Sequence, residues 1–411
     1  MRLDDRLRDD ATQLAGDLTD LRHRLHRRPE IGLDLPLTQQ TLLRELDDLG
    51  LEITLGKSLS SITAVLRGGG AGGATVLLRG DMDALPVQEA TGVEFSSEID
   101  GAMHACGHDL HMTMLVGAAR LLAAHRDALN GDVVFMFQPG EEGWNGAGHM
   151  IEEGVLSAAG RRVDSAYGMH VISGKYPTGI FTTRGETLMA ASDWLKVTVR
   201  GAGAHGSTPY LGRDPITGAT EIISGLHALI TRRFNVFDPV VLTVGNLHGG
   251  TKRNIIPDDA HFDATVRTFS AEARERMRAE APTLCRRIGE AHGLEVDAEY
   301  LTEYPVTVND PDHANFAAAV ARDVFGDDGF APLVSPETGA EDFSHVLEQV
   351  PGCYLFLGAA TNGDYRNAPS NHSPRATFSD AVLPQGTLMH AQLAIRALAR
   401  DSSVAASVAA A

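Results

Sequence analysis

Residues 75–83 read Thr-Val-Leu-Leu-Arg-Gly-Asp-Met-Asp, an apolar run that ends in a pair of carboxylates. An apolar run without alternation predicts a strand buried on both faces of a sheet, which is typical of α/β proteins. Asp81 and Asp83 come where this strand ends, and open α/β sheets bind their ligands at the carboxyl ends of strands. Asp is also common in ordinary turns, so the pair alone is a weak signal of function.

Two further buried strands are predicted downstream, and each ends in residues that can bind a metal. Residues 132–138, Asp-Val-Val-Phe-Met-Phe-Gln, lead to Glu141 and Glu142, and residues 165–170 end in His170. Of two adjacent glutamates, one can bind a metal while its neighbour transfers a proton. Strand ends that supply Asp, Glu and His would rarely coincide by chance, which favours a metal site.

Residues 103–109, Met-His-Ala-Cys-Gly-His-Asp, add a thiol and an imidazole. Gly107 lets the backbone bend so that Cys106 and His108 can converge on one point. A helical apolar pattern follows, for which Asp109 is the predicted N-cap, and a cysteine before a helix N-terminus is favoured as the thiolate that a metal needs. Taken alone, the motif fits equally well a buried thiol beside surface histidines. The Asp, Glu and His residues at the three strand ends favour the metal site over this alternative.

The amino-terminal segment predicts two helices. Within residues 1–50, leucines recur on one face of each helix, and Pro29 separates the two. His23 and His26 lie among several arginines, which indicates a solvated helix end.

A second α+β segment interrupts the α/β pattern. Residues 190–300 read as strand, helix, strand, strand, helix and strand, which is the order of a small sheet with helices packed on it. Buried patterning resumes near Val306. We therefore predict an α/β domain formed by residues 1–189 and 301–411, with residues 190–300 as an inserted domain.

One loop carries a competing motif. Residues 201–206, Gly-Ala-Gly-Ala-His-Gly, match the glycine pattern of dinucleotide-binding proteins. That pattern requires a helix to begin at its third glycine, whereas Pro209 and Gly212 argue against a helix before about Asp214. The neighbouring strands also alternate, unlike buried parallel strands. His205 is instead a candidate for a polar group that faces a substrate.

Composition narrows the class of protein. The chain has 411 residues, with 35 basic against 54 acidic residues and a formal net charge of −19. Such a chain repels nucleic acid and anionic membranes. It has no apolar run near the ~20 residues of a membrane span and no visible secretory signal. Its three widely spaced cysteines suit a reducing cytoplasm better than a disulfide framework, so we expect a cytoplasmic protein.

Together these motifs resemble the M20 metallopeptidase family, in its aminoacylase, hippurate hydrolase and auxin-conjugate hydrolase branch. The matches occur in family order along nearly the whole chain, at residues 79–86, 103–109, 137–143, 168–170, 201–205, 248–257, 338–343 and 371–374. Two positions depart from the family pattern. Ala340 stands where serine is frequent, and Asn371 stands where leucine often precedes the histidine.

The resemblance implies a metallopeptidase-like catalytic domain, with a mixed buried sheet flanked by helices, that binds two divalent ions. These would be zinc, manganese, cobalt or nickel. Glu141 would be the general base, and Asp83 would orient a ligand. The ions would be held by Cys106, His108, Glu142, His170 and His372, with Cys106 bridging them.

The resemblance also assigns a role to the inserted domain, which would be a lid and dimerisation domain. His205 would help to polarise the scissile carbonyl, and in several relatives this histidine comes from the partner subunit. Asn254 and Arg267 are candidates for holding the α-carboxylate of the substrate, and Gly339 for contacting it. We therefore expect a homodimer or a higher homo-oligomer.

These expectations converge on a metal-dependent amidohydrolase. It would cleave small N-acyl-amino acids, with N-acetyl, N-benzoyl or related acyl groups, to a carboxylic acid and a free amino acid. A carboxypeptidase or dipeptidase of the same family is the first alternative. An NAD-linked zinc oxidoreductase and a metal-binding protein without catalysis are alternatives from other classes.

Overall fold

The computed structural model describes residues 3–70, 73–361 and 363–409, with only the backbone described for 401–409. The chain separates into two compact units. The first comprises Met1–Glu186, Val308–Val334 and His345–Ala411, and the second comprises Thr187–Thr307 and Ser335–Ser344. The chain passes between them at residues 186–187, 307–308, 334–335 and 344–345, and the first two crossings fall in β7 (Glu186–Met189) and β14 (Thr307–Asn309).

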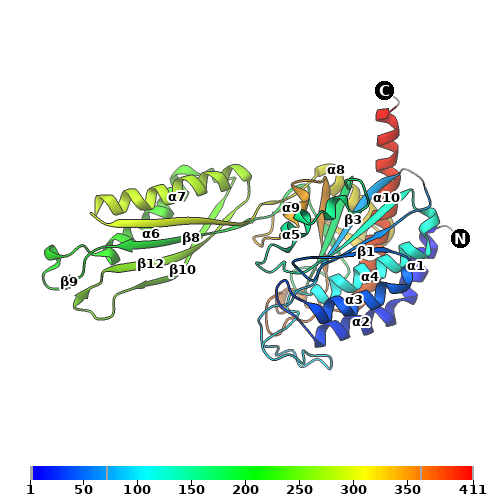
Figure 1. Cartoon of the computed structure of the whole chain (residues 1–411), viewed down its shortest axis with the longest axis horizontal. Coiled ribbons are helices and arrows are strands. Elements are labelled where there is room, and N and C mark those ends of the chain that lie inside the picture. Colours follow the sequence, from blue (N-terminus) through cyan, green and yellow to red (C-terminus); the bar gives the residue numbers. More distant parts are fainter. Residues whose placement is uncertain (1–2, 71–72, 362, 410–411) are drawn as a thin grey trace. The chain divides into compact units, whose positions relative to one another are not determined.

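The first unit is built on an eight-stranded mixed sheet (Figure 1). In spatial order its strands are β1 (Glu52–Leu55), β2 (Ile62–Leu66), β4 (Gly131–Gln138), β3 (Ala74–Asp81), β5 (Ser165–Ile172), β16 (Gly352–Gly358), β6 (Phe181–Thr183) and β15 (Phe330–Pro332). The helices within residues 1–186 and 308–411 are α1 (Leu3–Gln13), α2 (Ala15–Arg27), α3 (Pro36–Leu46), α4 (His108–Ala124), α5 (Gly146–Glu152), α8 (Pro311–Phe325), α9 (Ser344–Leu347) and α10 (Leu383–Ala409).

The centre of this sheet is parallel and buried, as the apolar runs predicted. Strand β3 pairs in parallel with β4 and β5, and β5 pairs in parallel with β16. Every residue of β3 is buried. Helices α4 and α10 pack on β3, and α2 and α3 pack on α4. Because β3, β4 and β5 run in one direction, their carboxyl ends meet at one edge of the sheet.

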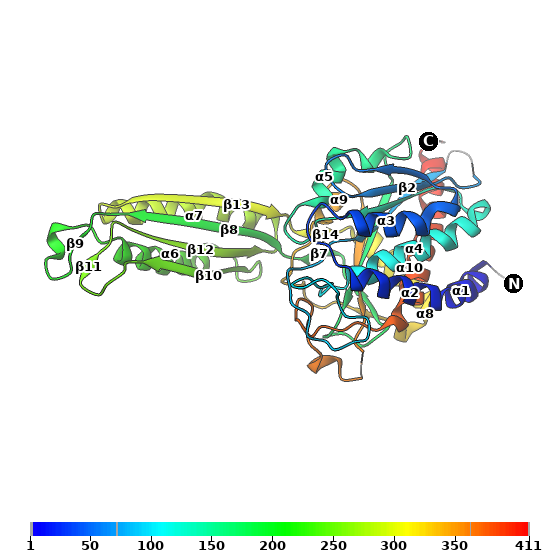
Figure 2. The same ribbon diagram turned by 60° about the horizontal axis from the view of Figure 1, so that its bottom comes forward.

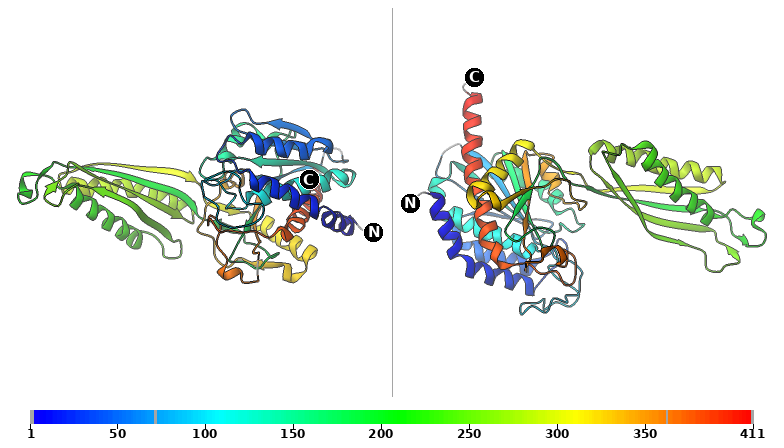
Figure 3. Two further views of the ribbon diagram at one scale, coloured as in Figure 1. Left: turned by 90° about the horizontal axis from the view of Figure 1, so that it is seen from below. Right: turned by 180° about the vertical axis from the view of Figure 1, so that it is seen from behind.

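The second unit is a four-stranded antiparallel sheet with two helices on one face (Figures 2 and 3). Its strand order is β10 (Val240–Gly249), β12 (Asp259–Thr268), β8 (Ala191–Arg200) and β13 (Glu295–Tyr304), and its helices are α6 (Pro215–Arg233) and α7 (Ala271–Ala291). Strand β12 alternates buried and exposed residues, since only one sheet face is covered by the helices. A short pair, β9 (Ala204–His205) with β11 (Ile255–Ile256), was not predicted.

This unit confirms the predicted strand–helix–strand–strand–helix–strand order and gives no support to a dinucleotide site. Strand β8 pairs antiparallel with both neighbours. After the glycine motif, a short 3-10 turn covers Pro209–Leu211, and α6 begins only at Pro215. A dinucleotide fold instead needs parallel strands and a helix that opens at the motif.

Candidate metal centre

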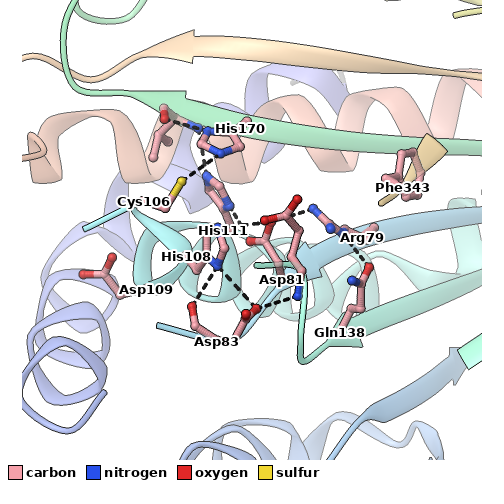
Figure 4. Close-up of polar contacts among 12 residues, drawn as sticks. Arg79, Asp81, Asp83, Cys106, His108, Asp109, His111, Gln138, His170 and Phe343 are labelled. Carbon is pink, nitrogen blue, oxygen red and sulfur yellow. Dashed lines mark hydrogen bonds and ion pairs between the residues drawn. The ribbon is translucent and has the colours of Figure 1, made fainter. Parts of the chain in front are cut away.

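Asp83 organises the edge of the sheet where β3 and β4 end. Its Oδ1 accepts the backbone N–H of Glu141 at 2.9 Å, and its Oδ2 accepts that of Glu142 at 3.0 Å. Its backbone oxygen lies 2.8 Å from His108 Nδ1 (Figure 4). The side chain is buried, so these bonds are what satisfies its charge. Asp83 thus bonds to the backbone of both glutamates and to the ring of His108.

Gly107 allows the chain to turn sharply between Cys106 and His108. Its φ is +87°, in the left-handed region, and a Cβ there would lie 2.4 Å from Val171 Cγ2. Only glycine adopts this conformation without strain. Helix α4 begins at His108, directly after the turn. The glycine therefore allows both the backbone turn and the close contact with β5.

The predicted N-cap role of Asp109 is wrong. The N-cap position is Gly107, and the Asp109 carboxylate is buried against α2. It accepts from Arg22 Nε at 2.7 Å and lies 2.8 Å from His26 Nδ1. The predicted solvated position of His26 is also wrong, because this ring is buried between Asp109 and Glu89. Tertiary ion pairing has replaced local capping.

The sulfur of Cys106 is the point on which the predicted ligands converge. Cys106 Sγ lies 3.3 Å from His170 Nε2 and 3.2 Å from His372 Nε2. Glu142 Oε1 lies 3.1 Å from His372 Nε2. Two groups of possible ligands, each with donor atoms within 4.8 Å of one another, share this sulfur: Cys106, His108 and His170, and Cys106, Glu142 and His372. A third such group contains His108, Glu141 and Glu142.

Hydrogen bonds orient two of these imidazoles for metal binding. His108 Nδ1 bonds to the Asp83 carbonyl, and His170 Nδ1 bonds to the Val171 carbonyl at 2.8 Å. In the neutral form of each ring the proton is on Nδ1, so Nε2, which faces the cluster, can bind a metal. His108 Nε2 is buried and has no hydrogen-bond partner among the residues that the structure describes. A metal ion is the natural partner for such a nitrogen, so the donor set fits one.

The centre has a negative field that favours cations. Burial would lower the pKa of His108, but the charge of Asp81 and the bond to Asp83 outweigh it and raise that pKa well above its usual value. Hydrogen bonds to Cys106 and Glu142 raise the pKa of His372 to about 10. Groups that stabilise a protonated imidazole also stabilise a divalent ion at the same place.

His170 is the exception within this field. Burial and the neighbouring His111 ring hold the pKa of His170 well below its usual value. The ring is therefore neutral, which is the form that binds a metal.

Behind this cluster, sequence reasoning named Asp81 but missed its partners His111 and Arg79. His111 Nδ1 lies 2.5 Å from Asp81 Oδ1, and His111 Nε2 accepts the Val171 N–H at 2.8 Å (Figure 4). Arg79 Nη1 donates to Asp81 Oδ2 at 2.6 Å. The spacing in the sequence could have indicated His111, because His108 and His111 are three residues apart and share one face of the helix.

The candidate residues of the second unit fall at two places. His205 on β9 pairs with Ile255 on β11, and the Gly206 N–H donates to the Asn254 carbonyl, so His205 and Asn254 are neighbours. Both are exposed. Arg267 lies on β12 opposite Ser192 and donates to its Oγ at 2.8 Å.

Arg267 and His205 lie towards opposite ends of the second unit, Arg267 on the four-stranded sheet and His205 on the separate β9–β11 pair. Along β12 the register runs from Asp259 opposite Arg200, near the β9 loop, to Arg267 opposite Ser192. Eight residues of strand span roughly 27 Å at ~3.4 Å each. A Cβ on Gly339 would lie 3.2 Å from Met189 Cε, just before β8 begins. The structure therefore brings His205 and Asn254 together, and Arg267 apart from them.

Comparison with known proteins identifies the family. Residues 77–396 match the model of peptidase family M20/M25/M40. Thermostable carboxypeptidase 2 of Saccharolobus solfataricus is 36% identical over 399 residues, which cover 96% of this chain and 99% of that protein. The N-acetyl-L-cysteine deacetylase of Bacillus subtilis is 34% identical over 373 residues, which cover 90% of this chain and 85% of that protein. The chain belongs to the M20 peptidase family, which confirms the resemblance.

A solved structure supports the fold. The Bacillus subtilis YXEP protein, described as a dinuclear metal-binding peptidase of the M20 family, superposes with a TM-score of 0.80 at 30% identity. The match covers 94% of this chain and 99% of that one. The predicted α/β fold with a smaller antiparallel domain is confirmed. Within the described parts of the chain, no helix is long and apolar enough to cross a membrane.

Proposed function

We propose that this M20 hydrolase is a metal-dependent amidohydrolase that cleaves N-acyl-amino acids to a carboxylic acid and a free amino acid. The observation that carries the proposal is the buried carboxyl of Glu141 beside a cluster of ligands that share the Cys106 sulfur. Similarity to an N-acetyl-L-cysteine deacetylase supports an N-acyl-amino acid as the substrate class.

The proposed centre holds two divalent ions, of zinc, manganese, cobalt or nickel. Thiolate, imidazole and carboxylate donors together suit these ions. When bound, such ions lower the pKa of a water molecule to roughly 7 and polarise a carbonyl oxygen. The proposed ligands are Cys106, His108, Glu142, His170 and His372.

Glu141 is the proposed general base. It would take a proton from the attacking water and return it to the nitrogen of the departing amine. Its backbone N–H is held by Asp83 Oδ1 while the neighbouring Glu142 N–H is held by Oδ2. One buried carboxylate therefore fixes the base and a ligand relative to each other, which is the pre-organisation that proton transfer needs.

We further propose that His205 stabilises the charge that develops on the scissile carbonyl, and that Asn254, Arg267 and Gly339 contact the substrate. An imidazole donor in this role is often worth about 3–4 kcal/mol. Arg267 lies towards the opposite end of the second unit from His205 and Asn254, which is too far for one chain to direct all three at one small substrate. This separation favours a homodimer in which His205 and Asn254 come from the partner subunit.

A carboxypeptidase is the second candidate, because a relative of that name is 36% identical. The two activities differ in the acyl group, which is an amino acid or peptide for a carboxypeptidase. The test is a panel of N-acetyl-amino acids, N-benzoyl-amino acids and dipeptides, assayed with each metal returned to chelated protein. Faster turnover of dipeptides than of every N-acylated substrate would refute the amidohydrolase proposal.

The variant Glu141→Gln separates catalysis from metal binding. It removes the base but keeps the size of the side chain and the backbone bond to Asp83. We expect loss of turnover with the metal content unchanged. Undiminished turnover in this variant would refute the role of Glu141, and a wild-type protein that binds metal but hydrolyses none of the panel would favour a binding protein.

A further inference from the structure

Asn371 directly precedes the proposed ligand His372, and its amide contacts two other segments that carry ligands. Its Nδ2 donates to the backbone oxygen of Cys106 at 3.1 Å and to that of Val171 at 3.0 Å. Its Oδ1 accepts the backbone N–H of Ser173 at 2.9 Å. Both N–H groups and the oxygen of the amide are thus bonded to backbone atoms, which come from two segments, the Cys106 loop and residues 171–173.

The Val171 carbonyl links Asn371 to the orientation of His170. His170 Nδ1 donates to this oxygen at 2.8 Å, which leaves His170 Nε2 unprotonated and 3.3 Å from Cys106 Sγ. A carbonyl oxygen has two lone pairs, so it can accept from His170 and Asn371 together. The hydrogen bond from Asn371 holds the Val171 carbonyl in place, and this carbonyl in turn keeps the proton of the His170 ring on Nδ1.

His372 is held by the same loop in an unfavourable backbone conformation. Its φ is +71°, and its N–H donates to the Ala105 carbonyl at 2.9 Å. A left-handed conformation costs a residue with a Cβ about 1–2 kcal/mol, and it persists only where neighbours fix it. Here it places Nε2 between Cys106 Sγ at 3.2 Å and Glu142 Oε1 at 3.1 Å. Asn371, the residue before His372, is bonded to the Cys106 loop.

We infer that Asn371 is a positioning residue, which holds the backbones beside Cys106, His170 and His372 in place for metal binding. The inference rests on the proposed metal centre and not on the proposed substrate. Leucine, which often stands here in the M20 pattern, has no N–H to donate. This chain therefore supports its ligands with bonds that a leucine cannot make.

The test is a cobalt titration of the full chain after chelation. In Asn371→Leu we expect the apparent dissociation constant for Co²⁺ to rise about 10- to 100-fold, the usual effect of removing a group that orients ligands. The thiolate-to-cobalt absorption band, which reports ligation by Cys106, should weaken at equal occupancy. The smaller Asn371→Ala removes the same donors without added bulk and should behave alike if the leucine variant fails to fold.

The matched control is Asn367→Leu. Asn367 lies in the same loop region but bonds through Nδ2 to the exposed Asp364 at 2.9 Å, so its replacement should leave cobalt affinity unchanged. Wild-type affinity and an unaltered band in Asn371→Leu would overturn the inference and leave the metal centre intact. A lower unfolding temperature with unchanged affinity would show a merely structural role and also overturn it. If the wild-type protein bound no cobalt, the metal centre and the inference would fall together.

Discussion

Replacing Gly107 with alanine should destabilise the protein in two separable ways. The residue has a φ of +87°, so a side chain there carries the cost of a left-handed conformation, about 1–2 kcal/mol. The new Cβ would also lie 2.4 Å from Val171 Cγ2, and overpacking of this kind costs about 1–3 kcal/mol. We therefore expect the free energy of unfolding to fall by about 2–5 kcal/mol, measured by urea denaturation of the metal-free protein.

The control for Gly107→Ala is Gly92→Ala. Gly92 has a φ of +75°, and a Cβ there would have no atom within 4 Å among the described residues. This variant should show only the backbone cost, about 1–2 kcal/mol. Combined with Val171→Ala, Gly107→Ala should cost less than the sum of the two single losses, because the clashing methyl group is gone. Equal losses for the two glycine variants would refute the packing argument.

Three further predictions concern the surroundings of the centre. Asp109→Asn should lower the free energy of unfolding, measured in urea, by about 3–5 kcal/mol, because it breaks a buried ion pair with Arg22. The control Asp380→Asn changes a partly exposed carboxylate that also pairs with Arg22, and it should cost about 0–1 kcal/mol. Equal losses for the two variants would contradict this prediction. Burial would raise the pKa of Glu89, but hydrogen bonds from His26 and other groups lower it to about 2. The ionised Glu89 therefore contributes fully to the free energy of unfolding above about pH 4.5, and this contribution is lost as the pH falls towards 2. The unfolding temperatures of wild type and Glu89→Gln should therefore differ at neutral pH and converge in acid, and a gap that widens in acid would have the wrong sign. Adding Zn²⁺ at about 100 times its dissociation constant to chelated protein should raise the free energy of unfolding by about 2.7 kcal/mol, and no shift in the urea midpoint would argue against a metal centre.

The sequence predicted the parts of this centre that follow from strand direction. Glu141 and Asp83 come after apolar runs, and runs buried on both faces imply parallel strands whose ends meet at one edge. The Cys106 turn could be predicted because its glycine is adjacent in sequence. These signals depend on neighbouring residues or on strand direction, so a single sequence is enough to predict them.

Long-range pairing escaped prediction for a physical reason. Asp109 looked like an N-cap because capping is a local preference, yet Arg22 and His26 approach it from a helix more than eighty residues away. The position of β16 between β5 and β6 likewise depends on packing that no local pattern encodes. Asn371 was visible only as a departure from a family pattern, and its partners emerged from the fold.

The Cys106 sulfur, which two of the possible ligand groups share, would make the proposed centre sensitive to the redox state of one atom. Conversion of the Cys106 thiolate to a sulfinate would remove the donor from both groups at once, and this step is irreversible for most proteins. A carboxylate in the same place would be indifferent to peroxide. The thiolate that suits the proposed centre to zinc would therefore also make metal binding there depend on a reducing environment.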